Sequence, residues 1–113
     1  MVELEGPERG LVVTAPVVAE IVLGARTEAR EAELRARLGL HPELAFRGAP
    51  DLDAGATIYR RCRQQGVAPG GLVDCVIAGI AMREGAALLT NDVGQARIAR
   101  AMPLRLDPAS VRA

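Results

Sequence analysis

The chain has 113 residues, the size of one domain, and half of them are apolar, with only Phe46 and Tyr59 aromatic. This composition excludes intrinsic disorder, and no stretch approaches the ~18 apolar residues that a membrane span needs. Fourteen arginines balance fourteen acidic residues, which excludes a uniformly basic coat for nucleic acid.

Strands and helices are expected to alternate from residue 11 onward, after a polar segment, Met1 to Gly10, that shows no strand. Short β-branched or apolar runs predict strands at 11–14, 44–46, 86–90 and 104–106. Apolar periodicity and capping residues predict helices at 16–23, 27–38, 74–84 and 93–100, and a further one from Asp51 or Asp53. This order is typical of a mostly parallel α/β sheet, whose ligands lie beyond the carboxyl ends of the strands.

The helix that starts at Asp51 or Asp53 is expected to be amphipathic. Its inward side chains are predicted to be Leu52, Ile58, Tyr59 and Cys62. An arginine cluster, Arg60, Arg61 and Arg63, is expected on its solvated face, with contact to RNA or an acidic partner as the alternative.

Three acidic residues stand alone in apolar segments. Glu20 is the only ionisable residue in 11–25, Asp74 the only one in 64–82, and Asp92 the only one in 85–96. Burying an unpaired carboxylate is unfavourable, and Glu20 and Asp92 lie just after predicted strands. The pattern therefore predicts a shared cation site, and oxygen ligands without His or thiolate favour Mg²⁺ or Mn²⁺.

Each acid also has an ordinary structural explanation. Asp74 is a suitable N-cap for the helix that it begins, and Asp92 beside Asn91 is a suitable turn residue. Glu20 has no capping role in mid-helix, but a buried ion pair with an arginine would account for it. Thr90 is a candidate accessory group that holds a water or a carboxylate. The isolated cysteines at 62 and 75 fit a reduced, cytoplasmic chain.

Three motifs together resemble one known family. They are Val17-Val18-Ala19-Glu20 with Gly24-Ala25-Arg26, then Leu72-Val73-Asp74-Cys75-Val76-Ile77-Ala78, then Ala87-Leu88-Leu89-Thr90-Asn91-Asp92. In this order and spacing they resemble the PIN-domain family, and most closely the VapC-type toxins of toxin–antitoxin pairs. The resemblance spans about residues 11–106 of a single domain, 1–113.

This resemblance implies a three-layer α/β/α fold and a Mg²⁺- or Mn²⁺-dependent endoribonuclease that leaves a 5′-phosphate and a 3′-hydroxyl. It implies Glu20, Asp74 and Asp92 as carboxylate ligands, with Thr90 as an accessory. Candidate RNA-binding residues are Arg26, Arg60 and Arg61. The implied partners are a small VapB-type antitoxin, whose tail covers the acidic site, and a second copy of the chain in a homodimer.

The sequence departs from the family at its beginning. The family's first strand ends in an Asp-Thr or Asp-Ser pair, whose Asp is a principal metal ligand, and nothing here matches it. That strand normally lies mid-sheet, between those matching 11–14 and 86–90, so its loss leaves an expected gap of ~9.6 Å. We expect a start site placed too late or an N-terminally shortened gene, which the intact mass of the protein from its native cells would distinguish.

Three functions are compatible with these residues. The first is a metal-dependent ribonuclease. The second is a catalytically inactive, truncated PIN domain that binds an antitoxin or a second protomer. The third is a structural or regulatory α/β domain whose acids bind no metal. Metal binding separates the first two from the third only in part, and RNA cleavage separates the first from the second.

Overall fold

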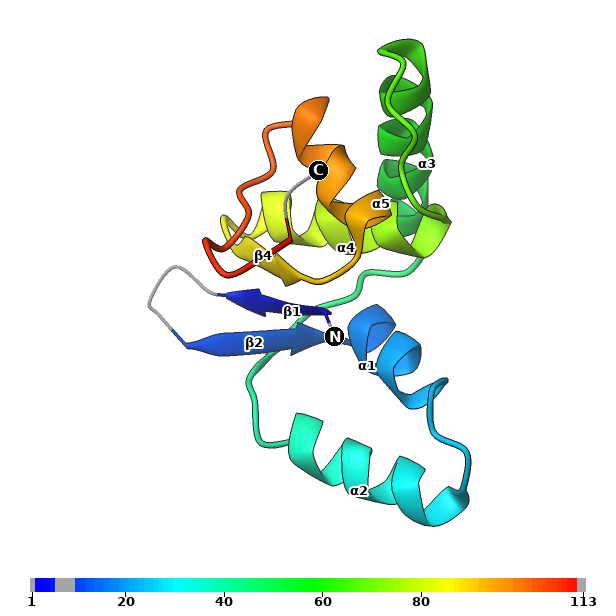
Figure 1. Cartoon of the computed structure of the whole chain (residues 1–113), viewed down its shortest axis with the longest axis vertical. Helices are drawn as coiled ribbons and strands as arrows, with labels where there is room; N and C mark the ends of the chain where they lie inside the picture. The colour runs from blue at the N-terminus through cyan, green and yellow to red at the C-terminus, as the bar shows by residue number, and fades with distance from the viewer. Residues whose placement is uncertain (1, 6–9, 112–113) are drawn as a thin grey trace.

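The computed structural model describes residues 2–5 and 10–111 and contains a four-stranded sheet. The strands are β1 (Val2–Glu5), β2 (Leu11–Thr14), β3 (Glu43–Leu44) and β4 (Ala87–Thr90). Their order across the sheet is β3-β2-β1-β4, as Figure 1 shows for β2, β1 and β4. Helices intervene between most of the strands, so the predicted α/β class is confirmed.

The central position of the sheet, which was expected to be empty, is occupied by β1. The expectation that Met1 to Gly10 contains no strand is therefore wrong for Val2–Glu5, whereas residues 1 and 6–9 lie outside the described residues. A strand between β2 and β4 satisfies backbone donors and acceptors that a gap would leave unpaired. β1 runs antiparallel to both neighbours, so the sheet is mixed.

The direction of β1 decides which residue reaches the edge where the site is expected. β2 and β4 are both antiparallel to β1 and therefore run in the same direction, so their carboxyl ends share one edge. At that edge the first residue of β1, Val2, pairs with the last residue of β4, Thr90. β1 thus occupies the position that was expected to be empty, with Val2 at the edge where β2 and β4 end.

Two capped helices follow β2, and both agree with the prediction. α1 (Ala15–Val22) begins where the Thr14 hydroxyl accepts a hydrogen bond from the Val17 N–H at 3.3 Å. α2 (Glu28–Leu38) is capped in the same way by Thr27, whose hydroxyl accepts from the backbone N–H three residues on. The two helices pack on each other beyond the end of β2 (Figure 1).

The next helix, α3 (Ala49–Gln64), begins two residues before Asp51 and corrects two predicted core positions. Ile58 and Cys62 are buried, but Leu52 is 46% exposed and Tyr59 is 36% exposed. Asp51 is buried instead, because it accepts a hydrogen bond from the Arg47 N–H at 2.7 Å and pairs with Arg83. The inward-facing residue at the start of α3 is therefore Asp51, paired with Arg83, and not Leu52 as the apolar pattern predicted.

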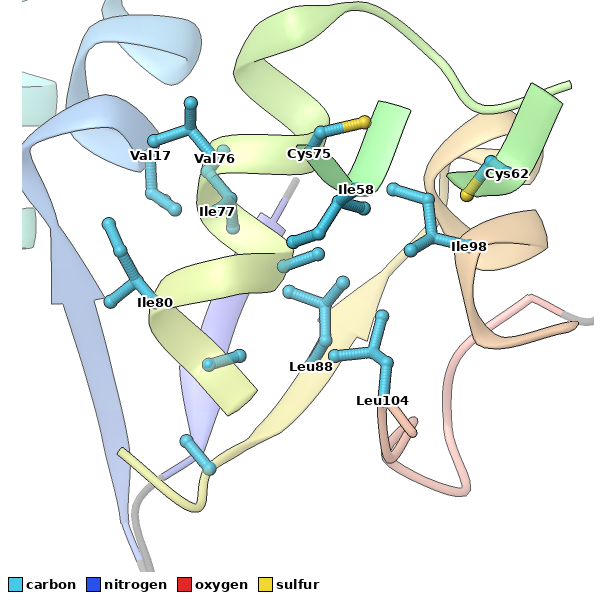
Figure 2. Close-up of a cluster of buried hydrophobic side chains, with 13 residues drawn as sticks. Val17, Ile58, Cys62, Cys75, Val76, Ile77, Ile80, Leu88, Ile98 and Leu104 are labelled. Atoms are coloured by element: carbon cyan, nitrogen blue, oxygen red, sulfur yellow. The ribbon is translucent and has the colours of Figure 1, made fainter. Parts of the chain in front are cut away.

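The core is built around α4 (Leu72–Arg83), which is apolar on most sides as expected for a central helix. Figure 2 shows its side chains meeting those of α1, α3 and β4. Gly55 lets α3 approach closely, because a Cβ there would lie 2.6 Å from Cγ2 of Val76. The core residues labelled in Figure 2 are Val17, Ile58, Cys62, Cys75, Val76, Ile77, Ile80, Leu88, Ile98 and Leu104.

The chain ends along β4. α5 (Val93–Arg97) continues into a 3-10 turn, η1 (Ile98–Arg100), as the prediction of a short helix at 93–100 requires. The predicted strand at 104–106 is reduced to one parallel bridge, between Leu88 and Leu106. Within the described ranges, no helix has the length and apolarity needed to cross a bilayer.

Candidate active site

Thr90 and Asp92 form a tight turn where β4 ends and α5 begins. The Thr90 hydroxyl is buried and accepts a hydrogen bond from the Asp92 N–H at 3.0 Å. One carboxylate oxygen of Asp92, Oδ1, accepts from the Gln95 N–H at 3.0 Å and so caps α5. Asp92 is therefore a helix cap, which agrees with its ordinary structural explanation. Its side chain is exposed at the edge of the sheet, where the second carboxylate oxygen, Oδ2, can meet a ligand.

Asp74 occupies the first turn of α4 and is not the N-cap. The helix begins at Leu72, two residues earlier than predicted, and Gly71 is the N-cap. Oδ2 of Asp74 reaches back and accepts a hydrogen bond from the Gly71 N–H at 2.9 Å. This backward bond satisfies one of the donors that a helix start leaves free, so Asp74 stabilises the helix from inside its first turn.

Two glycines allow these acids to approach each other. A Cβ on Gly70 would lie 1.9 Å from Oδ2 of Asp74, so only glycine fits beside that carboxylate. A Cβ on Gly94 would lie 3.1 Å from Oδ1 of Asp92 and 3.2 Å from Cα of Gly70. The backbone at Gly70 is thus in contact with both carboxylate-bearing segments. This packing explains how a loop and a short helix distant in sequence bring Asp74 near Asp92.

The two carboxylates interact electrostatically. Burial raises the pKa of Asp74 above its ordinary value, the hydrogen bond from Gly71 opposes that shift, and the charge of Asp92 raises the pKa further. Like charges in proximity disfavour each other's ionised form, and a cation between them would remove the conflict. The pair is therefore the strongest candidate for a cation site among the three predicted acids.

Glu20 stands apart from the other two acids. It is exposed on α1, and it makes no hydrogen bond or ion pair with another described residue, so the alternative of a buried pair with arginine is wrong. It lines a cavity of about 570 Å³ together with Asp92 and Asn91 from the turn after β4. Asp74 does not line this cavity.

The acids fit a metal ion only in part. Among residues 2–5 and 10–111, no three or more His, Cys, Asp or Glu side chains are close enough to hold one ion together. Among the described residues the predicted three-ligand cluster is not assembled, because Glu20 and Asp92 line one cavity and Asp74 does not line it. Mg²⁺ is often held by only one or two carboxylates with waters and phosphates, and Asp74 with Asp92 meets that minimum.

The predicted RNA-binding arginines are not at this cavity. Arg26, Arg60 and Arg61 are exposed, and none of them lines it. The cavity is lined instead by Arg30, which no motif in the sequence indicated. The position of Arg30 in the sequence could have drawn attention to it, because a basic residue in the first turn of a helix interacts unfavourably with the helix dipole.

Comparison with known proteins identifies the family of the chain. The family model of the PIN domain matches residues 3–101. The chain is 34% identical over 85 residues to the protein named VapC ribonuclease Mb1587 of Mycobacterium bovis, covering 75% of this chain and 63% of that relative. Ribonuclease VapC11 of Mycobacterium tuberculosis gives the same figures. The chain thus spans less than two thirds of the relatives' length. Because the family match covers most of its residues, the chain belongs to the PIN-domain family, which confirms the resemblance carried by its three motifs.

Proposed function

We propose that the chain is a VapC-type ribonuclease. It hydrolyses RNA phosphodiester bonds at a site formed by Asp74 and Asp92, beyond the end of β4. The observation that carries this proposal is the contact between the two carboxylate-bearing segments through Gly70 and Gly94. The kinship to proteins named as VapC ribonucleases supports RNA as the substrate.

Each residue has a distinct role in this proposal. Asp74 and Asp92 would hold a Mg²⁺ or Mn²⁺ ion, and Glu20 would lie beside the bound RNA in the cavity that it lines with Asp92. Thr90 positions Asp92 through the hydrogen bond that its hydroxyl accepts. When bound, such an ion lowers the pKa of a water molecule and neutralises charge on the phosphate that is attacked.

RNA cleavage with Asp74→Asn and a matched control tests the proposal. Wild-type protein is incubated with labelled RNA in Mn²⁺, in Mg²⁺ and in excess chelator. We expect cleavage only with the metals, and its loss in Asp74→Asn. Asp53→Asn is the control, because Asp53 is an exposed acid on α3 with no partner among the described residues. Cleavage that survives the chelator or Asp74→Asn would overturn the proposed site.

The Asp74→Asn variant is informative because it is expected to fold. The folded-state pKa of Asp74 is raised above 3.8, so its contribution to stability is present below pH 3.8 and is lost as the pH rises through the folded-state pKa. The asparagine carbonyl can still accept from Gly71. We therefore expect the melting temperature at pH 7 to equal or exceed that of wild type, with the advantage disappearing near pH 3. A lower melting temperature at pH 7 would contradict the assigned direction.

A second candidate function is binding without catalysis, which an apolar cavity favours. This cavity of about 350 Å³ adjoins Glu20 and is lined by exposed apolar side chains such as Leu23, Phe46 and Val73. In this alternative the chain holds a VapB-type antitoxin, or a second copy of itself, through that surface. Co-purification tests the complex with the antitoxin, and sedimentation of the isolated chain tests the complex of two copies. Phe46→Ser is expected to weaken either complex.

A further inference from the structure

The cavity that Glu20 and Asp92 line also has one basic residue, Arg30, in its lining. Three parts of the chain line it: α1 with the turn that follows it, the turn after β4, and the first half of α2. α2 contributes Arg30 and Leu34, so a guanidinium faces the same space as two carboxylates and the amide of Asn91. A cavity with both signs of charge suits a ligand that carries negative charge and approaches acidic groups.

Arg30 occupies a position that the helix itself disfavours. The other charged residues of α2 follow the helix dipole, with Glu28 and Glu31 in the first turn and Arg35 and Arg37 in the last. Arg30 lies in the first turn, near the positive end of the dipole. Its i,i+3 ion pair with Glu33 offsets part of this cost, and a ligand in the cavity would offset the rest.

The ion pair that Arg30 makes does not occupy it fully. Arg30 lies 3.1 Å from Oε1 of Glu33, and Arg37 donates to the same oxygen at 3.0 Å. Glu33 keeps a partner when Arg30 turns away, and the Arg30 side chain is 47% exposed. Exchange of such an exposed pair for a phosphate loses little, because exposed ion pairs contribute at most about 1 kcal/mol.

We propose that Arg30 is a positioning residue that holds a phosphate of the RNA strand in the cavity it shares with Glu20 and Asp92. This inference rests on the proposed function, since it takes RNA as the ligand. A polyanion that approaches Glu20 and Asp92 is repelled by both carboxylates, and a cation on the facing wall offsets that repulsion. The planar guanidinium also donates two parallel hydrogen bonds to a phosphate, which fixes the strand's orientation as well as its distance.

The test measures RNA binding without cleavage, and it uses a control on the same helix. A fluorescein-labelled single-stranded RNA of mixed sequence is titrated with full-length protein in excess chelator, and anisotropy gives the Kd at several salt concentrations. Arg30→Gln is compared with Arg37→Gln, which removes an arginine bonded to the same Glu33 oxygen but absent from the cavity lining. We expect about tenfold weaker binding for Arg30→Gln alone. The slope of log K against log salt should become shallower by about 0.7, the value for one RNA phosphate that the variant leaves unneutralised.

Arg30→Lys separates charge from geometry. It should restore the salt slope and recover only part of the affinity, because an ammonium does not reproduce the paired hydrogen bonds of a guanidinium. If wild type binds RNA and Arg30→Gln matches Arg37→Gln in both Kd and salt slope, the role of Arg30 is overturned while the ribonuclease proposal stands. If wild type binds no RNA in this assay, the role of Arg30 is overturned, and the ribonuclease proposal is decided by the cleavage test with and without metal.

Discussion

Substitution of Gly70 by alanine tests how the acid pair is assembled. The added Cβ would lie 1.9 Å from Oδ2, 2.8 Å from Cγ and 3.3 Å from Cβ of Asp74. The overlap with Cγ means that rotation of the carboxylate group alone cannot relieve it, so the whole side chain must change its rotamer or the loop must move. Either change breaks the hydrogen bond that Oδ2 accepts from the Gly71 N–H.

The size of the effect follows from this geometry. Ordinary contact begins near 3.4 Å, so Oδ2 must move by about 1.5 Å from its present 1.9 Å separation, far enough to lose its 2.9 Å bond. Loss of a capping interaction destabilises a protein by about 1 kcal/mol, and an unpaired N–H adds to this where water cannot replace the carboxylate. We expect Gly70→Ala to lower the free energy of unfolding by about 1–2 kcal/mol, or the melting temperature by roughly 4–8 °C.

Gly71→Ala supplies the control for this measurement. A Cβ at Gly71 meets no atom within 4 Å, and its φ of −91° suits any residue. Its stability, measured by urea unfolding and thermal melting beside Gly70→Ala, should fall by less than that of Gly70→Ala, because alanine is only a poorer N-cap than glycine and displaces no atom. Gly70→Ala should in addition lose RNA cleavage beyond what its reduced stability explains. Equal stabilities for the two variants would refute the steric argument, and full cleavage by Gly70→Ala would refute the need for this carboxylate position.

Two further predictions concern groups outside the site. Burial raises the pKa of Asp51, but the hydrogen bond from Arg47 and the pairing with Arg83 outweigh it, so the pKa lies below 3.8. The stabilisation from Asp51 is therefore present above pH 3.8 and lost as the pH falls through the lowered pKa. By urea unfolding, the free energy of unfolding of Asp51→Asn should be about 3 kcal/mol below that of wild type at pH 7, and this difference should shrink in acid. Burial, with Cys62 and Asp74 nearby, raises the pKa of Cys75 to about 11. Its thiol should not react with a disulfide reagent at pH 8 until the protein unfolds, and rapid reaction of the folded chain would contradict this.

Local signals in the sequence predicted most of the elements because those signals act within a few residues. Thr27 caps α2 and Gly39 follows its last residue, as their residue types indicate. β1 was missed because its alternation of Val, Glu, Leu and Glu, although typical of a strand, covers only four residues in a segment that is otherwise polar. Its strand form comes from pairing with β2 on one side and β4 on the other.

The candidate site was predicted only in part, since its geometry depends on contacts between distant segments. Isolation in apolar segments selected Asp74 and Asp92, whose carboxylates interact electrostatically in the structure. The same argument placed Glu20 with them, but an exposed position on α1 shows that an acid in an apolar segment is not always buried. The sequence shows Gly70 only as part of a loop, and its role as the residue that leaves room for the Asp74 carboxylate is visible only in the structure.

The acid pair bears on the choice between an enzyme and a structural domain. If Asp74 and Asp92 served only as helix caps, each could do so without the other, because their hydrogen bonds run to different helices. Burial, together with the nearby charge of Asp92, raises the pKa of Asp74 and so reduces stability at neutral pH. The position of the Asp74 carboxylate also leaves no room for a Cβ at Gly70, and the backbone of Gly70 comes close to Gly94. An arrangement that lowers stability and restricts two positions gains nothing for a purely structural role, and it is expected where a cation or a reacting group must be held.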